Sequence, residues 1–83
     1  MELYFFHVEY GEYFQDLSGT PLPSPTAARS AAVSLLGEIL RDESDRFWSK
    51  PEVTVTVTDS KGLTLWTLST SGREAATLSL SKG

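Results

Sequence analysis

The chain has 83 residues, of which 40% are hydrophobic and 22% charged, and its formal net charge is −4. This length allows one domain with one core, and these fractions are typical of a folded globular protein rather than a disordered one. The acidic balance disfavours nucleic acid as a partner, and no apolar run approaches the ~20 residues of a membrane span. The chain has no cysteine, which excludes disulfides and thiolate chemistry and fits a cytoplasmic location.

The N-terminal part of the chain predicts a hairpin of two strands. The first strand, Leu3 to Val8, is rich in aromatic and β-branched residues and has apolar side chains on both faces, which is typical of a central strand. A tight turn over residues 9–12 contains a glycine, and a short second strand returns over residues 13–16. Residues 16–21 combine aspartate, glycine and proline, which predicts another turn.

Residues 24–43 predict the one long helix, around which the rest of the chain is organised. Ser24 suits the N-cap, and Pro25 suits the first helical position, where its missing N–H would have no partner. Gly37 falls on the exposed side of the helix, where a glycine costs about 1 kcal/mol relative to alanine. The apolar side has helical spacing and is formed by Ala28, Ala32, Leu35, Leu36 and Ile39.

A charged segment over residues 41–50 closes the helix, and Phe47 and Trp48 interrupt it. We interpret this aromatic pair as a plug over the helix end, and an exposed contact patch is the alternative. The strand that follows is the clearest in the chain, because valine and threonine alternate over residues 53–58.

Two further elements end the chain. Residues 59–62 predict a hairpin turn with a final glycine, and residues 63–69 predict the returning strand. Residues 77–81 alternate again, but weakly. A fifth edge strand, a strand added to a neighbouring subunit and a frayed tail are the three interpretations left open there.

Together these elements predict a single α+β domain over residues 1–83, with an ordered core over about residues 2–70. The helix packs on one face of a four-stranded antiparallel sheet (ββαββ) of order 2-1-3-4, because a right-handed crossover lays the third strand beside the first. The opposite face is open and more apolar than a small monomer usually leaves in water, so we expect a homodimer or a protein partner there. This predicted interaction surface contains Leu3, Phe5, His7, Thr54, Thr56, Thr58 and Trp66.

The residues that carry chemistry are few. One histidine and no cysteine cannot form a zinc site of the usual kind, and the chain lacks a glycine-rich phosphate loop and a nucleophile elbow. We therefore predict no catalytic residue, no cofactor and no metal, and no enzymatic activity. His7 is expected to have a structural role within its strand; an acid–base role with Asp16 as its partner is the alternative.

A family resemblance rests on a few short patterns. Residues 4–8 read Tyr-Phe-Phe-His-Val, and Asp16, Gly19, a Leu-Pro pair at residues 22–23 and an alanine-rich helix follow. These patterns, with Asp-Ser-Lys-Gly at residues 59–62, resemble a family of short bacterial proteins described as a domain of unknown function (DUF6894). The resemblance covers about residues 4–69 and implies a small stand-alone protein. It carries over His7, Asp16 and Gly19 without a role.

The chain also has a weaker resemblance to HicB-like antitoxins, which begin with an aromatic strand and hairpin followed by a helix on the sheet. The usual DNA-binding appendix of those proteins is missing here. This resemblance implies a module that masks a toxic, basic RNase. The first 28 residues contain four acids and no lysine or arginine. A solvated surface and a basic partner at the hairpin are the two interpretations of that asymmetry.

Overall fold

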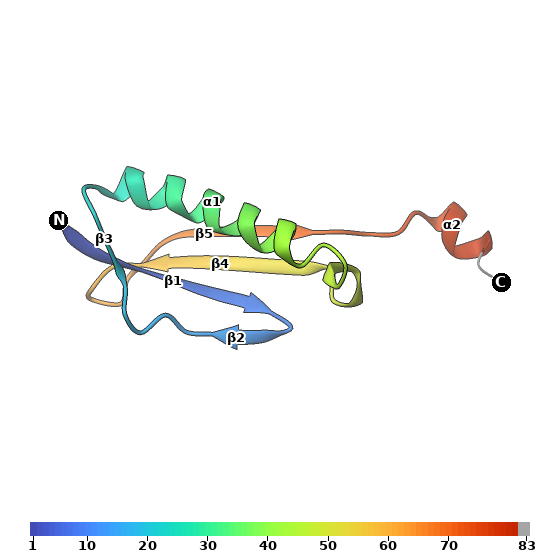
Figure 1. The fold of residues 1–83 in the computed structure, drawn as a ribbon, viewed down its shortest axis with the longest axis horizontal. Coiled ribbons are helices and arrows are strands. Elements are labelled where there is room, and N and C mark those ends of the chain that lie inside the picture. The colour runs from blue at the N-terminus through green and yellow to red at the C-terminus, as the bar shows by residue number, and fades with distance from the viewer. Residues whose placement is uncertain (82–83) are drawn as a thin grey trace.

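A computed structural model describes residues 1–81 and shows an α+β fold with one main helix against an antiparallel sheet (Figure 1). The sheet has five strands, in the order β2-β1-β4-β5, and β3 is bonded to β1. The elements, in chain order, are β1 (Glu2–Tyr10), β2 (Glu12–Phe14), β3 (Thr20–Leu22), α1 (Pro25–Asp42), the short 3-10 helix η1 (Phe47–Ser49), β4 (Glu52–Thr58), β5 (Thr64–Ser71) and α2 (Ala76–Ser81).

The predicted strand order is confirmed, because the first and third predicted strands lie side by side as β1 and β4. The valine row of β4 faces α1, and Val53, Val55 and Val57 are fully buried. The turn between β4 and β5 is held by Asp59, whose side-chain oxygen accepts hydrogen bonds from the backbone N–H groups of Lys61 and Leu63. These local signals explain why the two C-terminal strands were predictable.

The start of α1 also follows the prediction. The hydroxyl of Ser24 accepts a hydrogen bond of 3.1 Å from the N–H of Ala27, and Pro25 is the first helical residue. The predicted apolar stripe faces the sheet, where Ala28, Ala32 and Leu36 are buried. Ala28 and Ala32 are small and lie in the first half of the helix, so that half can approach the strands closely.

Gly37 lies on the outer side of α1, and a Cβ atom added there would meet nothing within 4 Å. We expect Gly37→Ala to stabilise the protein by about 1 kcal/mol, since alanine loses less backbone entropy than glycine in a helix. For a domain of this size that gain raises the melting temperature by about 4–8 °C. Calorimetry of the two proteins checks this, and an unchanged melting temperature would contradict it.

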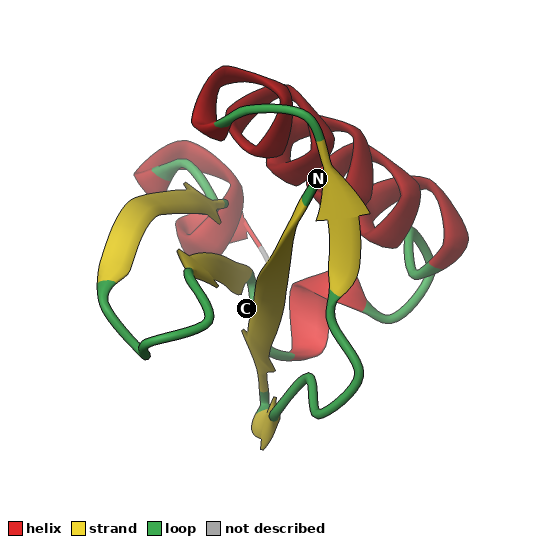
Figure 2. Cartoon of the chain, turned by 90° about the vertical axis from the view of Figure 1, so that its left-hand side faces the viewer, coloured by secondary structure: helices red, strands yellow, loops and turns green. Residues whose placement is uncertain are grey.

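The helix lies nearer to β4 and β5 than to the N-terminal hairpin. Its first turn is tied to β5, because Trp66 Nε1 donates to the carbonyl oxygen of Pro25 at 3.3 Å and the Arg29 guanidinium lies 5.1 Å from the Trp66 ring centroid. Figure 2, viewed roughly along the strands, shows α1 on one side of the sheet. Tyr4, at the start of β1, is buried, but the helix-facing side chains that follow it are only partly covered, and Phe6, Val8 and Tyr10 stay half-buried.

Two details of the N-terminal prediction were wrong. Thr20–Leu22, placed in a turn, forms β3 and pairs with residues 2–4 of β1. A proline at the centre of such a short segment hides the strand in the sequence, and it is tolerated because β3 is an edge strand. The second strand ends at Phe14, so Asp16 lies in the following loop rather than in a strand.

Of the three interpretations left open for residues 77–81, the fifth edge strand is wrong, because residues 76–81 form the short helix α2. This helix projects from the end of the sheet, away from the core (Figure 1). Two adjacent alanines, Ala75 and Ala76, favour helix more than the alternating pattern favours strand. Of the aromatic pair before β4, Phe47 is buried as the predicted plug, whereas Trp48 is 61% exposed.

Candidate interaction surface

The face of the sheet opposite α1 has no other element across it in residues 1–81, and we call it the open face. The register of β1 and β4 sets Phe5 opposite Thr58 and His7 opposite Thr56. Leu3 and Thr54 follow on the same face by the alternation of side chains along a strand. The structure thus brings together all of the predicted surface residues except Trp66.

The placement of Trp66 on the open face was wrong. Trp66 pairs with Val57, so its ring lies on the helix side of the sheet. There the indole N–H finds the carbonyl oxygen of Pro25 as its acceptor. The N–H of a half-buried indole needs such an acceptor. The threonines on the open face near Trp66 would not pack against its ring as the helix does.

Two exposed residues of this surface were missed by the sequence analysis. Tyr13 pairs with Glu9 on the open face, is 59% exposed, and its ring centroid lies 6.1 Å from that of His7. Leu17 follows in the loop after β2 and is 81% exposed. The hairpin register could have placed Tyr13, whereas the sequence has no signal for the side on which Leu17 lies.

His7 is buried, and both of its ring nitrogens are engaged. Its Nδ1 accepts a hydrogen bond of 3.1 Å from the backbone N–H of Asp16, and its Nε2 lies 3.0 Å from the hydroxyl oxygen of Thr58. Because Nδ1 is an acceptor, the proton of the neutral ring is on Nε2, which donates to Thr58. The histidine therefore links the loop after β2 to the last residue of β4.

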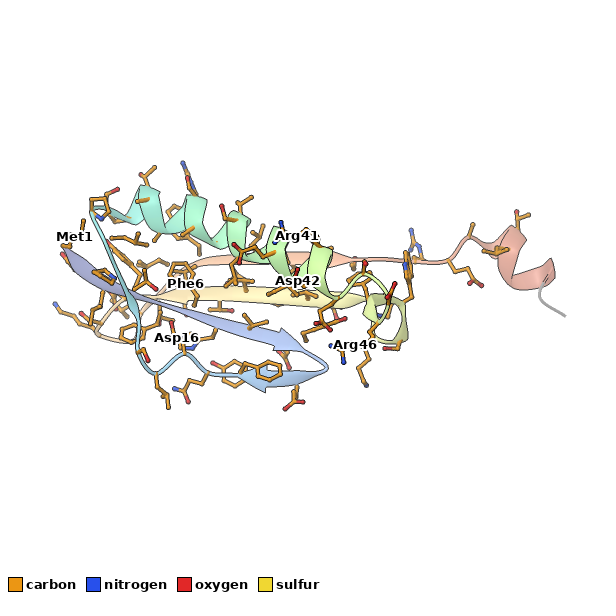
Figure 3. All side chains as sticks on the ribbon, in the orientation of Figure 1. Met1, Phe6, Asp16, Arg41, Asp42 and Arg46 are labelled. Carbon is orange, nitrogen blue, oxygen red and sulfur yellow. The ribbon has the colours of Figure 1, made fainter. Side chains whose placement is uncertain are left out.

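The Asp16 carboxylate organises that loop, and we call residues 15–19 the Asp16 loop. One oxygen, Oδ2, accepts from the N–H of Phe6 at 3.0 Å, and Oδ1 accepts from Ser18 at 3.0 Å and Gly19 at 3.1 Å. β1 pairs with β3 at residues 2–4 and with β2 at residues 8–10. The carboxylate, which lies beside β1 in Figure 3, fills the gap between these pairings and replaces a strand neighbour.

These contacts set the charge of the loop. Burial by itself raises the pKa of Asp16, but the N–H groups of Phe6, Gly19 and Ser18, together with nearby His7, outweigh it and hold the pKa below the ordinary value of 3.8. A lowered pKa means that the ionised carboxylate stabilises the fold. That stabilisation is fully present above the ordinary pKa and is lost as the pH falls through the folded-state value.

Gly19 closes the Asp16 loop and meets the open face. Its φ is +75°, and a Cβ atom built on it would lie 2.9 Å from Cε2 of Phe5. The Phe5 ring therefore lies directly on the glycine backbone. The three residues carried over from the family pattern without a role, His7, Asp16 and Gly19, thus join Phe5 in one structural unit.

The chemistry open to this unit is limited. A hollow of about 490 Å³ on the open face is lined in part by His7, Tyr13 and Asp16. The Asp16 carboxylate points to backbone N–H groups rather than to the imidazole, unlike a carboxylate that orients a catalytic histidine. Within residues 1–81, no group of three or more His, Asp or Glu side chains could hold a metal ion. No helix in that range is both long and apolar enough to cross a membrane.

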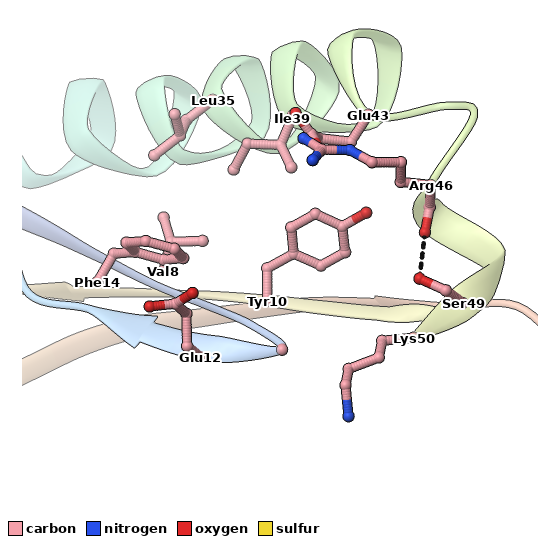
Figure 4. Close-up of a pocket in the computed structure, with 11 residues that line it drawn as sticks. Val8, Tyr10, Glu12, Phe14, Leu35, Ile39, Glu43, Arg46, Ser49 and Lys50 are labelled. Carbon is pink, nitrogen blue, oxygen red and sulfur yellow. Dashed lines mark hydrogen bonds and ion pairs between the residues drawn. The ribbon is translucent and has the colours of Figure 1, made fainter.

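A second concavity lies on the helix side, along the half of the sheet that α1 leaves uncovered. It has a volume of about 600 Å³, and Val8, Tyr10 and Phe14 rise from the strands toward Leu35 and Ile39 of the helix (Figure 4). Charged residues border it, and they are Glu12, Glu43, Arg46 and Lys50. The groove thus has an apolar floor and a rim of mixed charge.

The fold and the Asp16 loop define a small α+β protein whose first strand is completed by an aspartate carboxylate in place of a strand neighbour. The chain belongs to the family described as "Domain of unknown function (DUF6894)", whose model matches residues 3–71. This confirms the family resemblance. Neither the curated proteins nor the solved structures give a significant match.

Proposed function

We propose that this protein is a non-enzymatic protein-interaction module that acts through the open face. The observation that carries the proposal is the set of exposed apolar side chains there, since Leu3 is 41%, Tyr13 59% and Leu17 81% exposed. Apolar side chains gathered on one surface of a small protein mark contact with a partner. The use of His7 and Asp16 in structural hydrogen bonds supports a role other than catalysis.

The open face also favours a particular kind of contact. Its centre is a row of threonine hydroxyls, and its apolar residues gather along β1 and the Asp16 loop. A second copy of the chain has the same exposed apolar residues, and a two-fold axis would let each copy cover those residues of the other. A second copy is therefore the simplest partner, and the mass of the protein in solution tests it.

We expect Leu17→Glu to weaken assembly through the open face, because it places a charge among the exposed apolar residues of that face. The change should leave the fold intact, since the Leu17 side chain is 81% exposed. Ser30→Glu is the matched control, since it adds the same charge on the exposed outer side of α1. Light scattering behind a sizing column, over a concentration series, should show the wild-type mass halved in Leu17→Glu and unchanged in Ser30→Glu. Equal masses for all three proteins would contradict self-assembly through this face.

An antitoxin-like inhibitor of a basic protein is a second candidate, favoured by exposed Glu9 and Glu12 at the tip of the N-terminal hairpin. Exposed carboxylates there would steer a basic partner electrostatically. A neighbouring reading frame that encodes a small basic protein would supply the test partner. Its association rate should fall with added salt and with the double change Glu9→Gln and Glu12→Gln, and a salt-independent rate would count against this candidate.

A further inference from the structure

The outer edge of β5 is unpaired among the described residues, because β5 is the last strand of the sheet and pairs only with β4. Its segment, Thr64–Ser71, reads Thr-Leu-Trp-Thr-Leu-Ser-Thr-Ser and contains no charge, proline or glycine. An exposed edge strand of this kind presents a row of free N–H and C=O groups and is a template for pairing with another strand.

The opposite edge of the sheet is blocked against strand pairing, so the two edges differ and the β5 edge is the unblocked one. There β2 has only 3 residues, β3 has a proline at its centre, and the Asp16 carboxylate occupies the gap between them. Short strands, prolines and inward-pointing charges are the devices by which proteins prevent edge pairing. One edge carries all three devices. The β5 segment carries none of these three, and its one irregularity is the register shift at Leu65, near the start of the strand.

We propose that β5 pairs antiparallel with β5 of a second copy around a two-fold axis, so that two sheets join into one. A two-fold axis normal to the sheet keeps both α1 helices on the same side, and residues opposite one another must then share a face. A register shift at Leu65 sets Thr64 and Trp66 on opposite faces, so regular alternation begins at Trp66. Two central registers meet the condition from there on, one pairing residues 66–68 with each other and one pairing residues 66–70 with each other. Both set Thr67 directly opposite Thr67 or Ser69 of the second copy.

The apolar residues at this edge fit such a pairing. Trp66 and Leu68 are half-buried on the helix side of β5 and would pack against their counterparts. Val33, one helical turn after Arg29, lies toward β5 and is 58% exposed. With α1 centred near β4, the two helices would be about 14 Å apart, three strand spacings of about 4.8 Å, so they avoid a clash and Val33 of each faces the gap.

The strand composition favours a second copy over an arbitrary peptide. The chain has a net charge of −4, yet the paired segment contributes no charge to repel its counterpart. This pairing uses the sheet edge and is independent of the proposed contact at the open face.

Amide hydrogen exchange, followed by NMR in the Leu17→Glu protein, tests the proposal with the open face blocked. In an edge strand, alternate N–H groups point outward and exchange quickly. We expect the outward amides of residues 64–71 to become protected as the concentration rises, together with a mass of twice 9.1 kDa. A mass of 9.1 kDa at every concentration, with alternate β5 amides still exchanging quickly, would overturn the proposal.

A pair of opposite charges separates edge pairing from misfolding. Thr67 lies opposite Thr56 on the open face, so its variants are made in the Leu17→Glu protein, where that face is blocked. Thr67 is exposed, so Thr67→Lys and Thr67→Glu should each fold and each lose the dimer, because like charges would lie opposite or diagonal to each other across the axis. An equimolar mixture of the two should regain the dimer and the amide protection. Thr67→Val, the uncharged control at the same site, should keep both. Dimers that survive in both charged variants, or a mixture that stays monomeric, would overturn the proposal.

Discussion

Replacing Asp16 with alanine is expected to destabilise the protein by about 3 kcal/mol, because it leaves several backbone N–H groups without the charged acceptor that they share. Phe6, Ser18 and Gly19 all donate to this carboxylate at 3.0–3.1 Å. The Phe6 N–H is partly buried between β1 and the Asp16 loop, so water would replace the lost acceptor poorly. Urea unfolding of the variant and the wild type measures the difference.

Two further variants define the role of Asp16. Asp42→Ala is the matched control, because Asp42 is 66% exposed and its carboxylate forms a surface ion pair with Arg41 at 3.5 Å, so the change should alter stability by less than about 0.5 kcal/mol. Asp16→Asn keeps one oxygen for Ser18 and Gly19 but sets an amide N–H₂ against the Phe6 N–H, and it should fall between the two. Equal unfolding free energies for Asp16→Ala and Asp42→Ala would contradict the structural role.

Acid unfolding provides an independent check on the same carboxylate. Since the folded-state pKa of Asp16 lies below 3.8, its contribution to stability should persist at neutral pH and disappear as the pH falls below that value. The Asp16→Asn protein lacks this titration. Its stability should therefore fall less steeply than that of the wild type over the same acidic range, and parallel curves would contradict the prediction.

Gly19→Ala is expected to destabilise the protein by about 2–3 kcal/mol, through two separate causes. Gly19 has a φ of +75°, which an alanine adopts only with strain, and the added Cβ would lie 2.9 Å from the Phe5 ring. Atoms at that distance overlap, so the ring or the Asp16 loop must move. Loss of the loop geometry would also weaken the hydrogen bond from the Asp16 N–H to His7.

A second glycine separates the two causes. Gly62 has a φ of +85° but nothing within 4 Å of the added Cβ, so Gly62→Ala should cost only the backbone strain, about 1 kcal/mol. A double-mutant cycle with Phe5→Leu isolates the contact, because a smaller side chain should relieve part of the Gly19→Ala cost. Equal costs for the two glycine variants would show that the Phe5 contact is unimportant.

Most of the sheet could be predicted from the sequence because its signals are local. The valine–threonine alternation of β4 and the turn at Asp59 identify the C-terminal hairpin, and the Ser24 cap identifies the helix start. The crossover rule then sets the strand order. α2 was missed because two leucines that alternate with serine resemble a strand, although the preceding alanines favour a helix.

The candidate surface was less predictable, since its details depend on side-chain contacts across the fold. Period-two alternation assigns Trp66 to either face of β5, and only the pairing with Val57 and the hydrogen bond to Pro25 decide between them. The sequence pairs His7 and Asp16 only as a hint of acid–base chemistry. The two residues do meet, but in a structural contact, because the backbone N–H of Asp16, not its carboxylate, contacts the imidazole.

The central position of β1 has a consequence for the order in which the chain can fold. This strand is synthesised long before one of its neighbours, β4, which ends at Thr58, and the pairing of Phe5 with Thr58 spans most of the family-matched region. Closing so long a loop costs entropy before the contact repays it, which slows folding. Until then, a growing chain exposes the apolar helix-facing side of its N-terminal hairpin. The blocked edge formed by residues 15–22 then leaves the nascent hairpin with one edge open to strand pairing, the edge of β1 that later binds β4.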